Sequence, residues 1–247
     1  MPDSSSWEIV SAPIPTVADG EFLVQLQEFS MDPAMRGWMN ASPAAAAAVE
    51  LGQAMRATGA GTVIDSRHPT IHVGSQVVGM FNAQAYAVSD GTGVTVVDPE
   101  LGSSSMYLGL LGLSGLTAYF GLIAHANPRA GDTVVVSAAA GAVGSIVGQL
   151  ATLSGCRTIG IAGGSDKCAR IVAELGYDIG LDYKHPDFLT ELSASCPEGI
   201  DLYFDNVGGE VLNAALGNIA LHGHAVLCGG ISQYNATSRP PGPSNNM

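Results

Sequence analysis

The residues with the clearest chemical potential form a glycine-rich turn in the middle of the chain. The run is Ala139-Ala140-Gly141-Ala142-Val143-Gly144, a G-x-G-x-x-G pattern with alanine at the first glycine. Small residues at this spacing let a pyrophosphate approach the backbone N–H groups of a helix N-terminus, where the helix dipole favours negative charge. Glycine patterns arise by chance in a chain with 32 glycines. This one follows a predicted strand and opens a predicted helix, which is the context of dinucleotide binding.

The end of the next predicted strand indicates which dinucleotide fits. An acid there would bind a ribose 2′-hydroxyl, but the run from Ile161 to Ser165 has none, and Asp166 comes only at the helix start. Lys167 and Arg170 follow, three residues apart on one predicted helix face. In a chain with 9 Lys and Arg residues, this placement favours a 2′-phosphate and therefore NADP over NAD. The alternative is that the two side chains only form a solvated helix face.

The glycine-rich turn belongs to a region of alternating strands and helices that begins near residue 131. Apolar β-branched runs predict strands at 133–137, 157–162, 179–183, 201–205 and 225–228. Periodic apolar positions predict helices at 144–153, 166–175, 186–193 and 210–221. Gly176 is the expected C-cap of the second of these helices. Five strands alternating with helices indicate an α/β, Rossmann-type, doubly wound parallel sheet.

The first hundred residues have a different pattern. They are rich in Gly, Pro, Val and Thr, with alternating runs such as 22–26 and 76–81 between turn residues, which predicts strands and turns. The sequence therefore predicts two domains, a β-rich one at residues 1–105 and a dinucleotide-binding one at 106–247.

Composition excludes several classes of protein. The chain has 247 residues, a formal net charge of −13 and 47% hydrophobic residues, so it has enough apolar residues for a packed core. The acidic balance, with no Lys/Arg run, argues against a nucleic acid partner. Two uncharged stretches, 101–128 and 133–156, are interrupted by polar residues and glycines, so they are interpreted as buried elements and no membrane span is expected. The N-terminus has no basic and apolar leader, which makes a cytoplasmic location the expectation.

A metal site is not indicated by the sequence. His68 and His72 have ligand-like spacing, but a proline lies between them and no third ligand is evident, which favours a surface loop. The cysteines form no C-x-x-C pair, which predicts reduced thiols, mostly buried. They are Cys156, Cys168, Cys196 and Cys228.

Five ordered motifs give residues 9–234 a family resemblance. The motifs are MDPAMRGWM at 31–39, GLTAYFGL at 115–122, AAAGAVGSIVGQ at 138–149, FDNVGGE at 204–210 and CGGISQYN at 228–235. Together they resemble the zinc-independent medium-chain dehydrogenase/reductases, within them the NADP-dependent alkenal reductase and enone reductase group, which includes prostaglandin and curcumin reductases. The resemblance implies a GroES-like N-terminal domain and a metal-free oxidoreductase. Its expected reaction is reduction of the C=C bond of α,β-unsaturated aldehydes and ketones by hydride transfer from NADPH.

The resemblance also implies roles for individual residues. The pyrophosphate contacts are expected from Gly141, Ala142, Val143 and Gly144, and the 2′-phosphate contacts from Lys167 and Tyr183. The expected contacts on the nicotinamide side are Asn206, Cys228, Gly229, Gly230, Ile231, Ser232, Gln233 and Tyr234, with Thr117 as a weaker candidate. Tyr234 is the expected catalytic hydrogen-bond donor to the substrate carbonyl oxygen, where negative charge develops. The alternative is a tyrosine that only packs against the cofactor.

Two departures from the family pattern leave alternatives open. Ala45 stands where the family has a tyrosine near the active site, and the chain resembles a reductase shortened at both ends. From the resemblance, the expected function is still that of an NADPH-dependent enone reductase acting on a small-molecule enone or enal. An NADPH quinone reductase and a shortened NADP-binding chain without turnover are the alternatives. The resemblance implies a homodimer through the sheet edge, whereas the shortened sheet argues against one.

Overall fold

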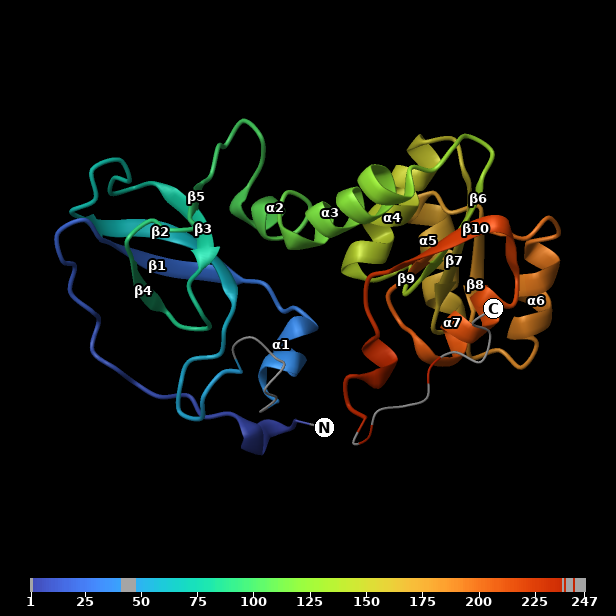
Figure 1. Cartoon of the computed structure of the whole chain (residues 1–247). Coiled ribbons are helices and arrows are strands. Elements are labelled where there is room, and N and C mark those ends of the chain that lie inside the picture. Colours follow the sequence, from blue (N-terminus) through green and yellow to red (C-terminus); the bar gives the residue numbers. More distant parts are fainter. Residues whose placement is uncertain (1, 41–47, 237, 239–241, 243–247) are drawn as a thin grey trace. The chain divides into compact units, whose positions relative to one another are not determined.

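The computed structural model describes residues 2–40, 48–236, 238 and 242. Ala45 lies outside these described residues. The chain divides into two compact units, Met1–Gly112 (unit 1) and Leu113–Met247 (unit 2) (Figure 1). Within the described part of the chain, every helix is too short or too polar to cross a membrane.

Unit 1 is built on an antiparallel sheet in the order β4-β1-β2-β3-β5. Its strands are β1 Phe22–Phe29, β2 Thr58–Ser66, β3 Gln76–Met80, β4 Tyr86–Ser89 and β5 Thr95–Val96. Its helical segments are η1 Ser4–Ser6, α1 Ala34–Trp38 and α2 Ser104–Leu108. Alternate side chains of β1, including Phe22 and Val24, enter one buried cluster because successive residues of a strand point to opposite faces. The strand-and-turn pattern predicted for this region is confirmed.

Unit 2 is built on a parallel sheet in the order β10-β9-β6-β7-β8. Its strands are β6 Thr133–Ser137, β7 Arg157–Ala162, β8 Ile179–Asp182, β9 Ile200–Asp205 and β10 Ile219–Leu227. Its helical segments are α3 Leu113–Ala118, the π-helix η2 Tyr119–Ala126, α4 Ala142–Leu153, α5 Ser165–Leu175, α6 Phe188–Ser195, α7 Gly209–Leu216 and η3 Ile231–Gln233. The predicted α/β fold class, a Rossmann-type sheet with a β-rich first part, is confirmed.

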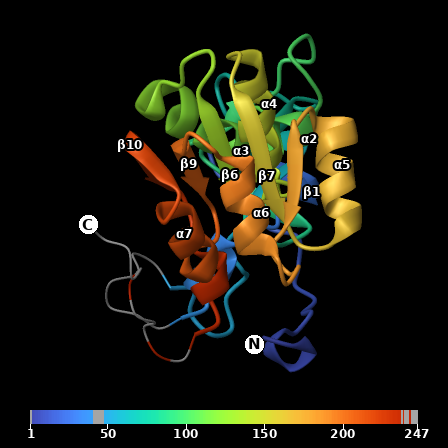
Figure 2. The ribbon, with the colours of Figure 1, turned by 90° about the vertical axis from the view of Figure 1, so that its right-hand side faces the viewer.

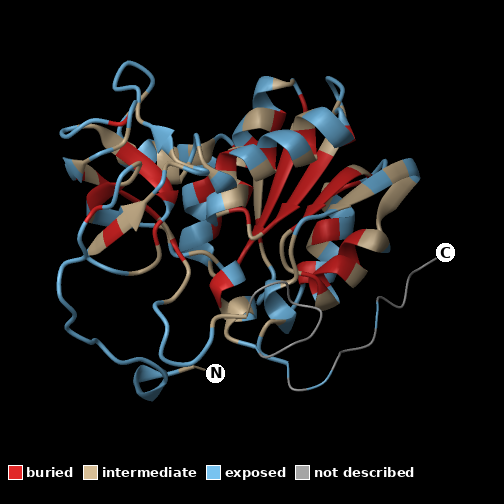
Figure 3. Cartoon of the chain, turned by 60° about the vertical axis from the view of Figure 1, so that its left-hand side comes forward, coloured by how far each residue is buried: buried red, intermediate tan, exposed pale blue. Residues whose placement is uncertain are grey.

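The parallel sheet is covered on both faces, which is why its strands are nearly continuous apolar runs. Val134 and Val136 of β6 pack with residues of α4 and α5, whereas Val135 packs with residues of α6 and α7. Figure 2 shows α6 and α7 in front of this sheet, and Figure 3 shows its central strands buried. The sheet therefore presents its strand ends, rather than its faces, to ligands.

One predicted helix is wrong in its second half. The helix expected at 210–221 is α7, which ends at Leu216, and the chain then enters β10, which is longer than the predicted strand at 225–228. The Asn218 side chain donates back to the Ala214 carbonyl at 2.8 Å, and the Asn218 carbonyl accepts the Ile200 N–H at 2.8 Å. Pairing with β9 thus replaces the helical hydrogen bonds from this point.

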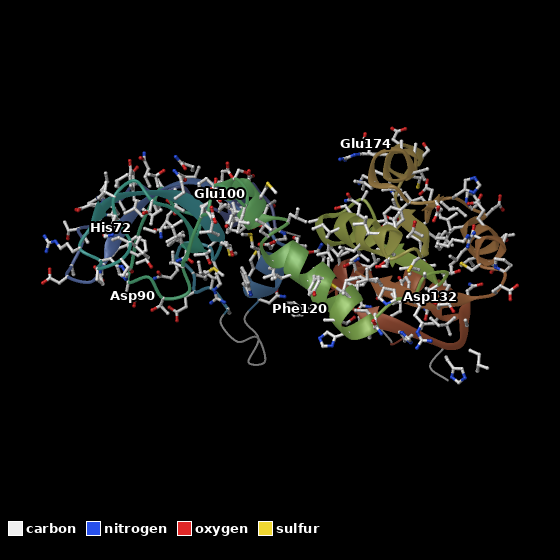
Figure 4. All side chains as sticks on the ribbon, turned by 90° about the horizontal axis from the view of Figure 1, so that it is seen from above. His72, Asp90, Glu100, Phe120, Asp132 and Glu174 are labelled. Atoms are coloured by element: carbon white, nitrogen blue, oxygen red, sulfur yellow. The ribbon has the colours of Figure 1, made fainter. Side chains whose placement is uncertain are left out.

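The expected burial of residues 101–128 is wrong for one helix face. Leu113, Leu116 and Phe120 are exposed, with Phe120 at 52% (labelled in Figure 4), although Ala118 and Leu122 are fully buried. The exposed residues are spaced i, i+3 and i+7, so they share one side of α3 and η2. The lack of charge predicted a buried element, but one side of α3 and η2 is exposed.

Candidate functional site

The glycine-rich turn joins β6 to α4 and presents a helix N-terminus. Ala138 adopts a left-handed conformation (φ 47°), and its carbonyl accepts the Gly141 N–H at 2.8 Å. Gly141 is the N-cap of α4, and both Gly141 and Ala142 are exposed. The first N–H groups of a helix have no intrahelical partner. The predicted pyrophosphate residues therefore lie at a helix N-terminus, the kind of backbone position that favours anions, and two of them, Gly141 and Ala142, are exposed.

Two further glycines and a tyrosine fix the position of this turn. A Cβ at Gly144 would collide with the Ala138 carbonyl, and a Cβ at Gly148 would collide with the Tyr177 ring. The buried Tyr177 hydroxyl donates to the Gly144 carbonyl at 2.7 Å. Burial raises the pKa of Tyr177, so the hydroxyl stays a donor. The close packing of α4 against the glycine-rich turn and Tyr177 thus requires glycine at both positions.

The residues predicted for the 2′-phosphate lie at the carboxyl ends of β7 and β8. Gly164, with φ 100°, is the N-cap of α5, and the exposed Lys167 lies in the first turn of that helix. Tyr183 follows β8, and its ring lies against Gly163, where a Cβ would be 2.9 Å from the tyrosine Cε1. Arg170, the second cation of the sequence argument, is paired instead with Glu174 at 2.8 Å, which is labelled in Figure 4.

A buried carboxylate organises the turn after β9. Asp205 is 1% exposed, and its carboxylate accepts hydrogen bonds from the hydroxyls of Ser137 (3.0 Å) and Tyr203 (2.9 Å). It also accepts the N–H groups of Val207 (3.1 Å) and Gly208 (3.0 Å). Burial and the Asp205 charge raise the pKa of Tyr203, which therefore remains a donor. Because all these donors bind the single Asp205 carboxylate, the turn is held at the end of β9.

Asn206 is brought together with the loop that follows β10. The Asn206 backbone N–H donates to the Ser137 hydroxyl, and its side-chain amide donates to the Ser137 carbonyl, both at 2.8 Å. The Asn206 carbonyl accepts the Ile231 N–H at 3.3 Å, and the Ser232 hydroxyl donates to the Val207 carbonyl at 2.6 Å. The predicted nicotinamide-side residues thus form one hydrogen-bonded group at the ends of β6, β9 and β10.

Tyr234 lies at the end of this group with a hydroxyl that has donor capacity left. Its oxygen accepts the Gly230 N–H at 3.4 Å, which orients the ring without using the hydroxyl proton. Cys228, at the start of the same loop, is an exposed residue. Partial desolvation of its sulfur by neighbouring residues, together with the Asp205 charge, raises the pKa of its thiol. The Tyr234 hydroxyl can therefore still donate a hydrogen bond, and Cys228 is a thiol rather than a thiolate at neutral pH.

Thr117 belongs to α3, and the histidine pair belongs to unit 1. Thr117 is half-buried in α3, which packs against α4. His68 accepts the Ile71 N–H at 3.1 Å through Nδ1, and its ring stands edge-on to Phe22 at 5.7 Å, so it closes a loop of unit 1. The described residues contain no group of three or more His, Cys, Asp or Glu placed to hold a metal ion.

Sequence reasoning missed four residues that support the site. Ser137 and Asp205 each end a buried strand, and a polar residue in that position is the signal that was available. Tyr177 and Lys184 lie outside every motif, and their contacts to the two turns depend on the fold.

The site extends along the carboxyl ends of all five parallel strands, from Tyr234 after β10 to Tyr183 after β8. This arrangement is that of a dinucleotide-binding Rossmann domain. Two family models agree with it. Residues 1–97 match the model described as N-terminal domain of oxidoreductase, and residues 142–243 match the model described as zinc-binding dehydrogenase.

Individual relatives define the family of this chain more narrowly. It is 40% identical to NADPH-dependent curcumin reductase of Escherichia coli over 93% of this chain and 67% of the relative. It is 39% identical to prostaglandin reductase 1 of Rattus norvegicus over 99% of this chain and 73% of the relative. The crystal structure of CurA from Vibrio vulnificus in complex with NADPH matches with a TM-score of 0.94 and 41% identity, over 99% of this chain and 73% of that one. The chain belongs to the zinc-independent medium-chain dehydrogenase/reductases, in the group of NADPH-dependent enone reductases.

Proposed function

We propose that this chain is an NADPH-dependent reductase of the C=C bond in α,β-unsaturated aldehydes and ketones. The observation that carries the proposal is the single hydrogen-bonded group formed by Asn206 and the 228–234 loop, next to the glycine-rich turn. Relatives named for NADPH-dependent curcumin reduction and prostaglandin reduction, and a similar structure solved with NADPH, support it.

The residues present fit NADP(H). The N–H groups of Ala142, Val143 and Gly144 would hold the pyrophosphate, with the backbone of Gly141 beside it, since these residues open the N-terminus of α4. Lys167 and Tyr183 would contact the 2′-phosphate, and Asn206 with the 228–234 loop would contact the nicotinamide side. When bound, NADPH supplies a hydride to the substrate carbon β to the carbonyl.

Side chains of the protein must stabilise the charge that hydride transfer creates on the substrate. Reduction at the β-carbon leaves negative charge on the carbonyl oxygen until a proton is added at the α-carbon. We assign the stabilising hydrogen bond to the Tyr234 hydroxyl, whose oxygen accepts the Gly230 N–H and whose O–H can still donate. The Asn206 and Asp205 hydrogen bonds hold the loop that carries it, so that the donor is positioned before the substrate binds.

The substrate class and the setting belong to the same proposal. A small conjugated aldehyde or ketone is the proposed substrate, and the cytoplasm is the proposed location. The domain limits 1–105 and 106–247 and a homodimer remain predictions from the sequence.

Turnover with purified protein tests the proposal. NADPH absorbance is followed with a trans-2-alkenal, with curcumin and with a quinone, and NADPH-induced thermal stabilisation is measured in parallel. Loss of NADPH with the alkenal or curcumin is the expected result. Oxidation with the quinone alone would replace the proposal by quinone reduction. Thermal stabilisation without turnover would indicate a cofactor-binding chain, and neither effect would refute both enzyme functions.

A further inference from the structure

The segment after β8 is tied to the turn after β7 by one carboxylate oxygen. Asp182, the last residue of β8, accepts the Gly164 N–H at 2.9 Å and the Lys184 N–H at 3.0 Å, both on Oδ1. These backbone hydrogen bonds lower the pKa of Asp182, so the carboxylate is charged at neutral pH. Asp182 thereby sets the position of Lys184 relative to the N-cap of α5.

The Lys184 side chain lies beside the same turn. A Cβ built at Gly163 would be 3.2 Å from Lys184 Cε and 2.9 Å from Tyr183 Cε1, so the two side chains flank Gly163 together. The Lys184 Nζ lies 5.9 Å from the centre of the Tyr183 ring. Lys184 and Lys167 are both exposed, and within the described part of the chain neither ammonium group forms a salt bridge. Two cations are therefore available around one glycine turn.

The position of this turn in the fold indicates which part of a dinucleotide it would contact. The carboxyl end of the second strand of a Rossmann sheet is where the ribose 2′ position of a dinucleotide is distinguished. An acid at that place favours a 2′-hydroxyl. Asp182 is an acid on the neighbouring strand end, although its charge is partly offset by the two N–H hydrogen bonds. A phosphate there carries between one and two negative charges at neutral pH. Its repulsion from Asp182 must therefore be offset by a nearby cation.

Building on the proposed NADP(H) binding, we propose that Lys184 makes a second lysine contact to the 2′-phosphate and decides the preference for NADPH over NADH, with Asp182 as its positioning residue. The carboxylate acts through its two N–H hydrogen bonds. Its charge, taken alone, repels the phosphate. Positioning of Lys184 strengthens NADPH binding, whereas charge repulsion weakens it. Variants of Asp182 can therefore separate the two effects.

Isothermal titration with NADPH, NADH and adenosine 2′-monophosphate tests the Lys184 contact. Loss of one charge-assisted hydrogen bond in Lys184→Met is expected to weaken NADPH and the monophosphate by roughly 5- to 20-fold, and NADH by less than about twofold. Lys184→Arg is expected to restore NADPH binding. Arg129→Met, which removes an exposed cation just before β6, is the matched control and is expected to change nothing.

The Asp182 variants separate positioning from charge. Asp182→Asn keeps an acceptor oxygen and removes the repelling charge, so NADPH binding is expected to be unchanged or tighter. Asp182→Ala removes the acceptor as well, and we expect NADPH binding to weaken by about fivefold while NADH changes little.

Two results would overturn the inference. These are unchanged NADPH binding in Lys184→Met, and equal losses for NADPH and NADH. Tighter NADPH binding in Asp182→Ala would refute the positioning role and leave only repulsion. If the unsubstituted protein binds neither dinucleotide, the proposed function itself fails, which is a different outcome from a loss confined to the variants.

Discussion

Asp205 and Tyr234 have opposite surroundings within one loop system. The Asp205 carboxylate is buried and accepts hydrogen bonds from two hydroxyls and two backbone N–H groups. The Tyr234 hydroxyl oxygen accepts a single long hydrogen bond, from the Gly230 N–H, which leaves its O–H able to donate. The first residue is therefore expected to determine stability and loop geometry, and the second to determine the rate of the chemical step.

Replacing Asp205 is expected to destabilise the protein. In Asp205→Ala, buried donors such as the Ser137 and Tyr203 hydroxyls lose their acceptor, which should lower the free energy of unfolding by about 2–4 kcal/mol. Denaturant unfolding measures this, with Asp19→Ala as the control because its partner Arg67 is 60% exposed and the pair is worth little. A loss no larger than the control's would contradict the role given to Asp205.

Removing the Tyr234 hydroxyl is expected to slow turnover without loosening the cofactor. Loss of one donor to a developing oxyanion costs about 10²- to 10³-fold in kcat, so Tyr234→Phe should show that loss while the Kd for NADPH changes by less than about threefold. Tyr119→Phe, an exposed tyrosine of η2, is the control. If NADPH binding falls as far as kcat, Tyr234 is a tyrosine that packs against the cofactor.

Cys228 is expected to react slowly despite its exposure. Because burial of its sulfur and the Asp205 charge raise the thiol pKa, the reactive thiolate fraction at neutral pH is smaller than for a free cysteine. The iodoacetamide labelling rate at this site, followed by peptide mass spectrometry, should keep rising as the pH passes about 8.5, the pKa of a free thiol. Rapid labelling that levels off near neutral pH would contradict the raised pKa.

Among the elements, α4 depends most closely on its partners. Its first turns are held by the Tyr177 hydroxyl, and the Tyr177 ring occupies the space beside Gly148. Gly148→Ala is expected to cost about 1–3 kcal/mol of unfolding free energy through overpacking, and Tyr177→Phe about 1 kcal/mol through the lost hydrogen bond.

Circular dichroism during chemical unfolding measures these losses. Gly37→Ala is the matched control, because Gly37 lies inside α1 and no atom of the described residues lies within 4 Å of its added Cβ. Alanine there should be neutral or stabilising by up to about 1 kcal/mol. A Gly148→Ala protein as stable as this control would refute the close approach of Tyr177.

The elements also show how far sequence reasoning extends. β6 and β7 were predicted with their exact bounds because buried parallel strands are continuous β-branched runs bounded by turns. The boundary of α7 and β10 was not, since it depends on the pairing of Ile219 with Ile200, which no local pattern reveals. The same reason applies to the site. The glycine turn is a local signal, whereas the Ser137–Asp205 hydrogen bond joins residues 68 positions apart.

At the scale of the whole molecule, the expected cofactor site lies in unit 2. Hydrogen exchange with and without NADPH should therefore show protection at 138–145, 163–167, 183–184, 205–208 and 228–234, since binding suppresses local opening. The central strands β1 and β2 of unit 1 should exchange unchanged. Protection confined to unit 1, or none at saturating NADPH, would contradict the placement of the site.

The central claim is that the chain reduces a C=C bond by hydride transfer from NADPH, and the fate of that hydride tests it most directly. The protein is incubated with NADPH deuterated at both C4 positions of the nicotinamide and a simple α,β-unsaturated ketone, and the product is analysed by NMR and mass spectrometry. The account predicts a saturated ketone with one deuterium on the former β-carbon and none on the carbonyl carbon. Deuterium on the carbonyl carbon of an allylic alcohol, or recovery of unlabelled enone, would contradict it.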